Sequence, residues 1–260
     1  MLKEIKFSVD NFQDISNEIK SSWEDPKMKV YVLKADKSPN DIREFYEKAF
    51  QYLGTPIALA EDVNLGGREN QRSGEIWMEV RYDPKHQDAY RHSANAQPLH
   101  TDGSYIHDFP SSTILACVVN AGEGGETTFI DSVDVYNILK EEQPVLFEKI
   151  INKNIPHARS GDYRDDAVIK VEENDIFVNW NYYCVDKSID SSLIQIADEF
   201  QNFLLTSQQI KDKTIGVKLQ PGDSVYWKDN YVLHGRNSFV ANKESERFIW
   251  KCAIDIGVFN

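Results

Sequence analysis

Cysteine and cationic side chains are both scarce in this sequence, and each scarcity excludes a class of protein. The three cysteines, Cys117, Cys184 and Cys252, are odd in number, far apart and set among apolar neighbours. This arrangement favours buried thiols over disulfides or a cysteine-bound metal cluster. Lysine and arginine total 29 against 42 aspartates and glutamates, which gives a formal net charge of −13. Nucleic acids and anionic membranes are bound by clustered cations, so we expect neither as a partner.

Long apolar runs are missing as well. No stretch approaches the roughly 20 apolar residues that span a bilayer, and residues 1–7 lack the apolar segment of a secretory signal. These absences lead us to expect a cytoplasmic protein. The composition, 41% hydrophobic and 12% aromatic, is typical of an ordered globular chain, and we expect residues 1–260 to form a single domain.

Short strand-like segments separated by turns make up most of the second half of the chain. Alternating or β-forming runs predict strands at 76–82, 113–119, 126–130, 168–171, 176–180, 215–219, 224–227 and 247–256. Helical spacing of apolar residues predicts helices at 39–53, capped by Asp41, and at 133–139, 144–151 and 189–205. Many short strands with few helices predict a β-rich α+β fold, a jelly roll with flanking helices on its outside.

The motif His-x-Asp occurs twice, at His100–Asp102 and at His86–Asp88. The first copy precedes the strand at 113–119, and in an extended segment its two side chains point to the same side. A lone histidine, His234, lies far downstream. Two histidines and one carboxylate are the ligand set of an Fe(II) centre that keeps one face open for a co-substrate and oxygen. The second copy lies in a polar segment, which we interpret as a solvated loop.

At each of these positions an ordinary structural role is the alternative. His100 beside Asp102 is also the pattern of a loop histidine next to a helix-capping aspartate, and His234 that of a strand-end histidine bonded to a carbonyl. Thr127 and Arg247 can together hold a terminal carboxylate, through a hydroxyl and a planar fork of N–H donors. Their alternatives are a turn threonine and a solubilising arginine.

Four motifs in a fixed order carry a family resemblance. They are His-Thr-Asp-Gly at 100–103, Gly-Gly-Glu-Thr at 124–127, Leu-His-Gly-Arg-Asn at 233–237 and Arg-x-x-x-Lys at 247–251. From Pro98 to its end, the sequence resembles the taurine dioxygenase-like (TauD/TfdA) superfamily of Fe(II)- and 2-oxoglutarate-dependent oxygenases.

The resemblance implies a fold, a set of site residues and an activity. The fold is a double-stranded β-helix, a kind of jelly roll, at 96–260, preceded by helix and strand elements at 1–95. The catalytic iron ligands are His100, Asp102 and His234, and the distal carboxylate of 2-oxoglutarate is bound by Thr127 and Arg247. The activity is a dioxygenase reaction that uses Fe(II), 2-oxoglutarate and O2 to hydroxylate an unactivated C–H bond.

The expected substrate is a small polar or anionic metabolite, such as an amino acid or a natural-product intermediate. Lys251 stands where the taurine enzyme has a second arginine, so taurine itself is not expected. The family's halogenases replace the carboxylate that Asp102 keeps, so halogenation is not expected either.

Four residues are predicted to contact the substrate: Lys251, Asn179, Trp180 and Tyr182. The last three come from an aromatic and amide-rich segment, 177–183, for which packing into the core is the alternative. Residues 60–74 are polar and contain glycine, and we expect them to form either a lid over the site or a surface loop.

Two other classes of protein fit the same three ligands. Three protein ligands plus a water molecule also suit a metal-dependent hydrolase, and a jelly roll can be a non-catalytic module that binds a small ligand. The hydrolase needs no co-substrate carboxylate site, so Thr127 and Arg247 discriminate it from the oxygenase. The binding module predicts no metal-dependent turnover.

Overall fold

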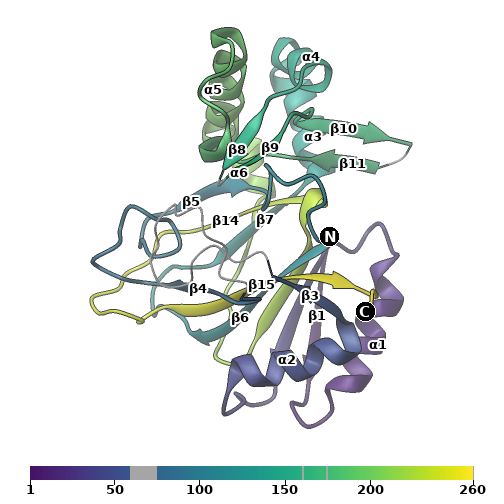
Figure 1. Cartoon of the computed structure of the whole chain (residues 1–260), viewed down its shortest axis with the longest axis vertical. Helices are drawn as coiled ribbons and strands as arrows, with labels where there is room; N and C mark the ends of the chain where they lie inside the picture. The colour runs from purple at the N-terminus through teal and green to yellow at the C-terminus, as the bar shows by residue number, and fades with distance from the viewer. Residues whose placement is uncertain (59–74, 160, 174, 260) are drawn as a thin grey trace.

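The computed structural model describes residues 1–58, 75–159, 161–173 and 175–259. The predicted lid segment, 60–74, lies outside this described part. Two β-sheets occupy the centre of the molecule, and helices cover the outer side of each (Figure 1). Among the described residues, no helix has both the length and the apolar character needed to cross a membrane.

The larger sheet has seven strands, in the order β1-β2-β13-β6-β15-β3, with β4 also paired to β15. Its neighbouring strands are antiparallel except for β1 and β2, which run parallel. The strands are β1 (Leu2–Phe7), β2 (Val30–Ala35), β3 (Gly54–Ile57), β4 (Met78–Arg81), β6 (Ser112–Val119), β13 (Ser224–Lys228) and β15 (Phe248–Ile256).

The smaller sheet has four strands in the order β12-β7-β14-β5. They are β5 (Gln97–His100), β7 (Thr127–Asp131), β12 (Ile215–Val217) and β14 (Val232–Arg236). Phe129 of β7 and Trp227 of β13 meet between the two sheets with ring centroids 5.5 Å apart, inside a buried cluster drawn from both sheets. These facing antiparallel sheets form a jelly-roll core, and the fold is the β-rich α+β class that the strand pattern predicts.

Helices and two hairpins pack on the outer faces. Helices α1 (Phe12–Trp23) and α2 (Ile42–Leu53) cover the larger sheet. Beyond the smaller sheet lie α3 (Ser132–Glu142), α4 (Pro144–Asn152), α5 (Ser191–Thr206), α6 (Gln208–Lys213) and the hairpins β8 (His157–Arg159)–β9 (Asp162–Arg164) and β10 (Ile169–Glu172)–β11 (Asp175–Val178). Two 3-10 turns, η1 (Tyr182–Cys184) and η2 (Asp229–Tyr231), complete the described elements.

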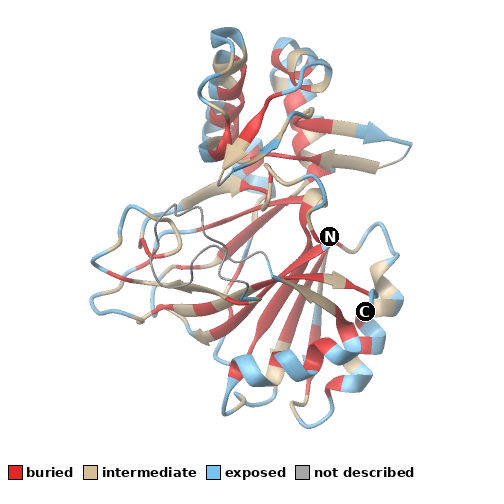
Figure 2. Cartoon of the chain, viewed as in Figure 1, coloured by how far each residue is buried: buried red, intermediate tan, exposed pale blue. Residues whose placement is uncertain are grey.

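Strand β6 shows why a continuous apolar run forms a central strand here. Ile114 and Ala116 belong to the cluster under α1 and α2, whereas Leu115 and Cys117 belong to the cluster between the sheets. Successive side chains alternate between the two faces of a strand. Because both faces of β6 are covered at 114–117, each of these four residues is apolar. Figure 2 shows this layering as buried strands beneath helices with exposed outer faces. The three cysteines are buried and form no disulfide, as predicted.

The first 95 residues require a correction. Strands β1 to β4 all come from this part of the chain and all belong to the larger sheet, so residue 96 does not begin a separate core. Strand β1 was not predicted, although it alternates between exposed Glu4 and Lys6 and buried Ile5 and Phe7. The prediction also missed β2, although Val30–Leu33 is an apolar run of strand-forming residues, and it missed helix α1.

The predicted cap of helix α2 is confirmed, whereas its predicted first residue is not. The backbone N–H of Glu44 donates a hydrogen bond of 2.9 Å to the Asp41 carboxylate, which satisfies one of the unpaired N–H groups at the helix start. The helix begins at Ile42 rather than at residue 39, because Asp41 is itself the capping residue.

Candidate metal centre and cavity

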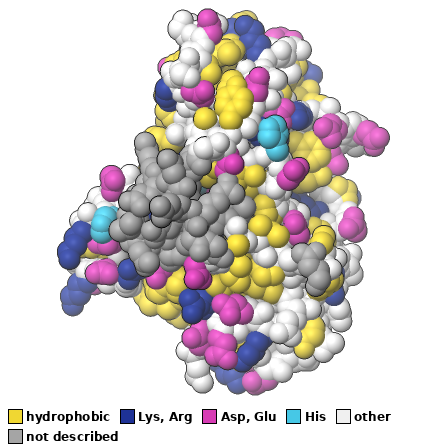
Figure 3. Space-filling view, in the orientation of Figure 1, with side chains coloured by type: hydrophobic (Ala, Val, Ile, Leu, Met, Phe, Trp, Pro, Cys, Tyr) yellow, Lys and Arg dark blue, Asp and Glu magenta, His cyan; other side chains and the backbone are white. Residues whose placement is uncertain are grey.

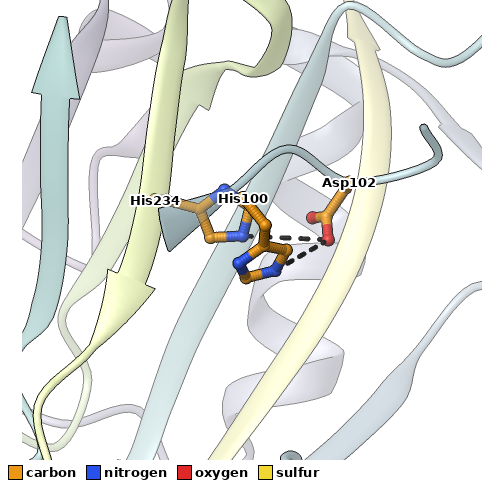
Figure 4. A group of neighbouring side chains, drawn as sticks. All are labelled: His100, Asp102 and His234. Atoms are coloured by element: carbon orange, nitrogen blue, oxygen red, sulfur yellow. Dashed lines mark ion pairs between the residues drawn. The ribbon is translucent and has the colours of Figure 1, made fainter. Parts of the chain in front are cut away.

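Three side chains that can bind a metal ion converge between the two sheets (Figure 4). His100, Asp102 and His234 each offer one ligand atom, and these atoms lie within 4.8 Å of one another. Oδ1 of Asp102 is 3.9 Å from Nε2 of His100 and 3.7 Å from Nε2 of His234. They are the only cluster of at least three such ligands in the described part of the chain.

The end of strand β5 positions the first two ligands. His100 is its last residue, and Nδ1 of its ring contacts the Pro98 carbonyl oxygen at 2.9 Å. Its Nε2 contacts the side-chain amide nitrogen of Gln97 at 3.1 Å and faces Asp102. Thr101 is fully buried on the opposite side. Its N–H donates to the Trp180 carbonyl at 2.6 Å, and its hydroxyl accepts from the Trp180 N–H at 2.9 Å. The alternation predicted for an extended segment is therefore present, with Thr101 held in place between the two ligands.

His234 lies in the middle of strand β14, opposite His100 of β5 and Phe129 of β7. The two imidazole rings are 4.2 Å apart between centroids. The alternative of a strand-end histidine bonded to a carbonyl does not hold, because Nδ1 of His234 is buried and has no hydrogen-bond partner among the described residues.

The donor set fits a divalent transition metal. Bonds of about 2 Å to donors in adjacent coordination positions place those donors about 3 Å apart, so side-chain shifts of less than about 1 Å bring the three observed atoms into position. Two imidazoles and one carboxylate on one side leave the opposite side open, which is the arrangement of non-heme Fe(II) oxygenases.

The protonation states of these side chains also fit a metal. Burial lowers the pKa of His100 and lowers the pKa of His234 well below its ordinary value. Burial raises the pKa of Asp102, but the charge and hydrogen bond of Lys251 oppose it, and the net pKa lies below its ordinary value. Burial, followed by the charge of Asp102, raises the pKa of Asp229 to about 8. Neutral imidazoles and an ionised carboxylate are what metal binding requires.

The two oxygens of Asp102 have different partners. Oδ2 accepts a hydrogen bond of 3.2 Å from the Thr113 hydroxyl, whereas Oδ1, the oxygen facing both histidines, pairs with Nζ of Lys251 at 2.6 Å. Lys251 thus lies on the inner side of β15, as its even spacing from Arg247 predicts. Its ammonium group pairs with an internal acid, which is the alternative to a substrate contact at this position, and the predicted contact with substrate stays a prediction.

Arg247 is a buried cation without a counter-ion. It is 2% exposed, and its guanidinium makes no hydrogen bond or ion pair with any described residue. Burial and the nearby charge of Arg236 lower the pKa of Arg247 to about 9. Burying a cation costs free energy unless an anion pairs with it. Thr127, 3% exposed, lines the same cavity, so the structure favours a carboxylate site over a solubilising arginine.

Two glycines with left-handed backbone make room at this site. Gly103 follows the ligand pair with a φ of 53°, and a Cβ there would overlap the ring of Phe109. Gly125 has a φ of 77°, and a Cβ there would lie 3.3 Å from Nε of Arg247. Left-handed backbone is costly for residues with a Cβ, so the glycines of both sequence motifs have a steric role.

The ligands and both candidate carboxylate-binding residues line one cavity of about 480 Å³. Of the four predicted substrate residues, Lys251 and Tyr182 line it, whereas Asn179 and Trp180 do not. Trp180 is fully buried in the core, and Asn179 donates to the Ser104 carbonyl at 3.1 Å. The structure favours the alternative for Asn179 and Trp180, packing into the core, because both support the ligand loop from behind.

Part of the cavity wall was not predicted from the sequence. Residues of the segment 87–95 line the cavity, and hydrogen bonds from Arg236 hold that segment against β14. Its guanidinium donates to the carbonyls of Tyr90, Ser93 and Asn95 at 3.0, 2.8 and 2.6 Å. The signal was available, because Arg236 lies two residues after His234 and therefore on the same side of the strand.

The match to known families covers most of the chain. The sequence model described as the taurine catabolism dioxygenase TauD, TfdA family matches residues 30–253. Human gamma-butyrobetaine dioxygenase is 25% identical over 162 residues, which cover 58% of this chain and 42% of the human protein. The match thus spans less than half the length of this curated relative.

Solved structures show the same fold. Asparagine oxygenase, in complex with Fe(II), 2S,3S-3-hydroxyasparagine and succinate, has a TM-score of 0.68 at 12% identity and covers 95% of this chain and 79% of its own. The non-heme iron oxygenase OrfP, in complex with Fe, succinate and (3S)-hydroxy-L-Arg, has a TM-score of 0.62 at 15% identity and covers 94% of this chain and 80% of its own. At these identities the likeness shows the fold alone.

Proposed function

Because the chain belongs to the taurine catabolism dioxygenase TauD, TfdA family, we propose that it is an Fe(II)- and 2-oxoglutarate-dependent dioxygenase that hydroxylates a small polar or anionic metabolite. The proposed catalytic iron ligands are His100, Asp102 and His234. The proposed co-substrate residues are Thr127 and Arg247, which hold the distal carboxylate of 2-oxoglutarate.

The protein's own contribution is to hold and shield these groups. Bound Fe(II) supplies the chemistry that activates O2 at the open face of the site. His100 and His234 are 7% and 5% exposed, so the ligands lie in a largely water-excluded site. The Thr113 hydroxyl holds the carboxylate of Asp102 by donating to its Oδ2. Arg247, which lines the same cavity, would orient the co-substrate by a charge-assisted contact with its distal carboxylate.

The guanidinium of Arg247 is the observation that carries the proposal. A hydrolase that uses the same three ligands leaves this buried, uncompensated cation unexplained. A binding module explains an anion at Arg247 but not two neutral imidazoles and a carboxylate gathered within 4.8 Å of one another. The oxygenase accounts for both features, because its co-substrate is a dicarboxylate that reaches from the metal to the arginine.

The charges lining the cavity support an anionic group on the substrate. The visible outer surface carries many acidic side chains (Figure 3), in keeping with the net charge of −13. The cavity differs, because its charged residues other than histidine are Arg91, Arg159, Arg236, Arg247 and Lys251 against Asp88 and Asp102. Cationic side chains thus outnumber anionic ones in the cavity lining, which favours a substrate that carries a carboxylate. Amino acids carry that group, as do the hydroxylated products in the two solved structures above.

The decisive test is co-substrate turnover in the purified protein. We expect Fe(II) and 2-oxoglutarate, added together without oxygen, to produce a weak visible absorption band. Admitting oxygen should then yield succinate. A panel of amino acids and other small carboxylates, followed by mass spectrometry for a gain of one oxygen atom, identifies the substrate. Metal binding without any use of 2-oxoglutarate would instead support the hydrolase, and ligand binding without metal would support the non-catalytic module.

Two further expectations stay predictions. One is the single domain over residues 1–260, which limited proteolysis checks as the absence of a stable fragment. The other is the cytoplasmic location, which cell fractionation followed by immunoblotting checks.

A further inference from the structure

A second carboxyl group lies directly behind the three candidate ligands. Asp229 occupies η2, the short connection between β13 and β14, and is 1% exposed. It has no place in the sequence motifs that resemble the family, and it does not line the cavity. Its Oδ1 accepts hydrogen bonds from the backbone N–H of Asp102 at 3.2 Å and from the indole N–H of Trp227 at 3.3 Å. One metal ligand is thus already tied to this carboxyl group.

Asp229 also lies close to a second candidate ligand, His234, but forms no hydrogen bond with it. Nδ1 of His234 lies 3.7 Å from Oδ1 of Asp229, just beyond hydrogen-bond distance. Nδ1 of His234 and Oδ2 of Asp229 are both buried, and neither has a hydrogen-bond partner among the described residues. Because Nδ1 lies so close to this carboxyl group, a small rotation brings its N–H within hydrogen-bond distance, and leaving the buried group unpaired is costly.

We propose that Asp229 is a positioning residue that orients His234 for the metal by accepting a hydrogen bond from its Nδ1–H. This inference rests on the proposed function. The proton held on Nδ1 keeps the lone pair of Nε2 on the side of Asp102 and the metal. The same carboxyl group already accepts the backbone N–H of Asp102, and an outer acceptor of this kind fixes the orientation of a metal-binding histidine. A single side chain then fixes two of the three ligands.

Counting donors and acceptors shows what the substitution Asp229→Asn changes. Three N–H groups face the Asp229 carboxylate, from Asp102, Trp227 and His234. A carboxylate offers about four acceptor sites, whereas an amide offers about two and adds two donors of its own. The asparagine amide therefore competes for Nδ1 of His234 and favours the ring form protonated at Nε2, which cannot bind a metal through that atom.

Asp223→Asn is the matched control. Asp223 is also buried, at 3% exposure, and also accepts three N–H groups, from Ala35, Gln220 and Lys34. It does not line the cavity. One donor to Asp223 is the ammonium group of Lys34, at 2.9 Å, so the cost of Asp223→Asn to folding should be at least that of Asp229→Asn. An effect on metal binding in Asp229→Asn alone is then not a consequence of lost stability.

The experiment measures Co(II) affinity by calorimetry and the visible spectrum of the bound Co(II). We expect Asp229→Asn to weaken Co(II) binding about 10- to 100-fold and to shift the spectrum, as loss of an outer partner of a metal-bound histidine does. Asp223→Asn should leave both unchanged. Equal Co(II) affinity in wild type and folded Asp229→Asn, or equal weakening in both variants, would overturn the proposal.

A measurement on the unaltered protein settles the matter if Asp229→Asn does not fold. In Zn(II)-loaded protein with 15N-labelled histidine, we expect the Nδ1–H of His234 to be protected from exchange and shifted downfield of that of His100, whose Nδ1 contacts only a neutral carbonyl. A rapidly exchanging Nδ1–H on His234 would overturn the proposal. Failure of the proposed function is distinct, because the wild-type protein itself would then bind no metal or make no use of 2-oxoglutarate.

Discussion

The two His-x-Asp motifs of this chain have the same residue types at the same spacing and lie in different surroundings. His100 and Asp102 are held between the sheets, within reach of His234. His86 instead contacts Asp83, Nδ1 to Oδ2, at 2.7 Å, with 43% of its side chain exposed. Asp88 is exposed in a turn at the edge of the cavity, so the predicted loop assignment for this copy is confirmed.

The difference teaches that the motif is completed by distant parts of the chain. Strand β14 brings His234 opposite His100, β6 supplies Thr113 to Asp102, and Trp180 holds the middle residue Thr101. The middle residue of the other copy, Gln87, bonds only to the backbone of its own segment, at Asp83, His92 and Ala94. A motif becomes a metal site where strand pairing buries it and supplies a third ligand.

The largest expected effect separates the two copies directly. His100→Ala and Asp102→Ala should each weaken Fe(II) or Mn(II) binding by more than about 100-fold, because loss of a ligand exceeds the effect of losing an outer partner. His86→Ala and Asp88→Ala should bind the metal as the wild type does. Calorimetric titration measures all four. Loss of binding in the His86 variant would reverse the assignment of the two copies.

The second effect compares two arginines near the two copies. Arg247→Met should raise the KM for 2-oxoglutarate about 10- to 150-fold, since a charge-assisted contact contributes about 1.5–3 kcal/mol. Arg81, on β4 close to the His86 copy, is 30% exposed and pairs with Glu79 and Glu244. Arg81→Met should leave the KM unchanged. Succinate formation at varied 2-oxoglutarate gives both values, and equal KM values in the two variants would contradict the co-substrate role.

The third effect concerns the middle residue of each copy. Thr101→Val preserves shape but leaves the buried N–H of Trp180 without its acceptor, which should lower the free energy of unfolding by about 1–3 kcal/mol. Gln87→Ala should cost less, because that side chain is exposed and water replaces its hydrogen bonds. Urea denaturation of both variants tests the order, and a larger loss in Gln87→Ala would contradict it.

The smallest expected effect comes from removing the His86–Asp83 pair. The hydrogen bond from His86 lowers the pKa of Asp83, so its contribution to stability is present above the ordinary aspartate pKa and is lost as the pH falls through the lowered value. Asp83→Asn should cost less than about 1 kcal/mol at pH 7. The difference from wild type should shrink as the pH is lowered towards 3, which urea denaturation at both pH values checks. A difference that grows on acidification would contradict this sign.

Several features of the site could be predicted because they are local. The step of two residues placed His100 and Asp102 on one side of the chain, and the step of four placed Arg247 and Lys251 on one side of β15. Turn glycines, the Asp41 cap and the apolar run of β6 are local signals of the same kind. The metal and co-substrate roles assigned to these residues stay predictions until binding is measured.

Other features could not be predicted because they depend on strand register. The aromatic segment 177–183 gave no sign that Trp180 faces the core while Tyr182 lines the cavity. Likewise, no local pattern places Lys251 on Asp102, because that contact depends on how β15 pairs with β6. A one-residue change of register exchanges the two faces of a strand, so such contacts follow from the assembled sheet.

The sequence by itself determined the types and order of the candidate ligands, the anionic character of the chain and the β-rich fold class, since composition and period-two patterns are properties of short segments. Only the tertiary structure decided which His-x-Asp copy meets His234, that Arg247 is buried without a counter-ion among the described residues, and that Asp229 lies behind two ligands. The physical reason is that burial, desolvation and contacts between distant strands arise only when the two sheets pack together.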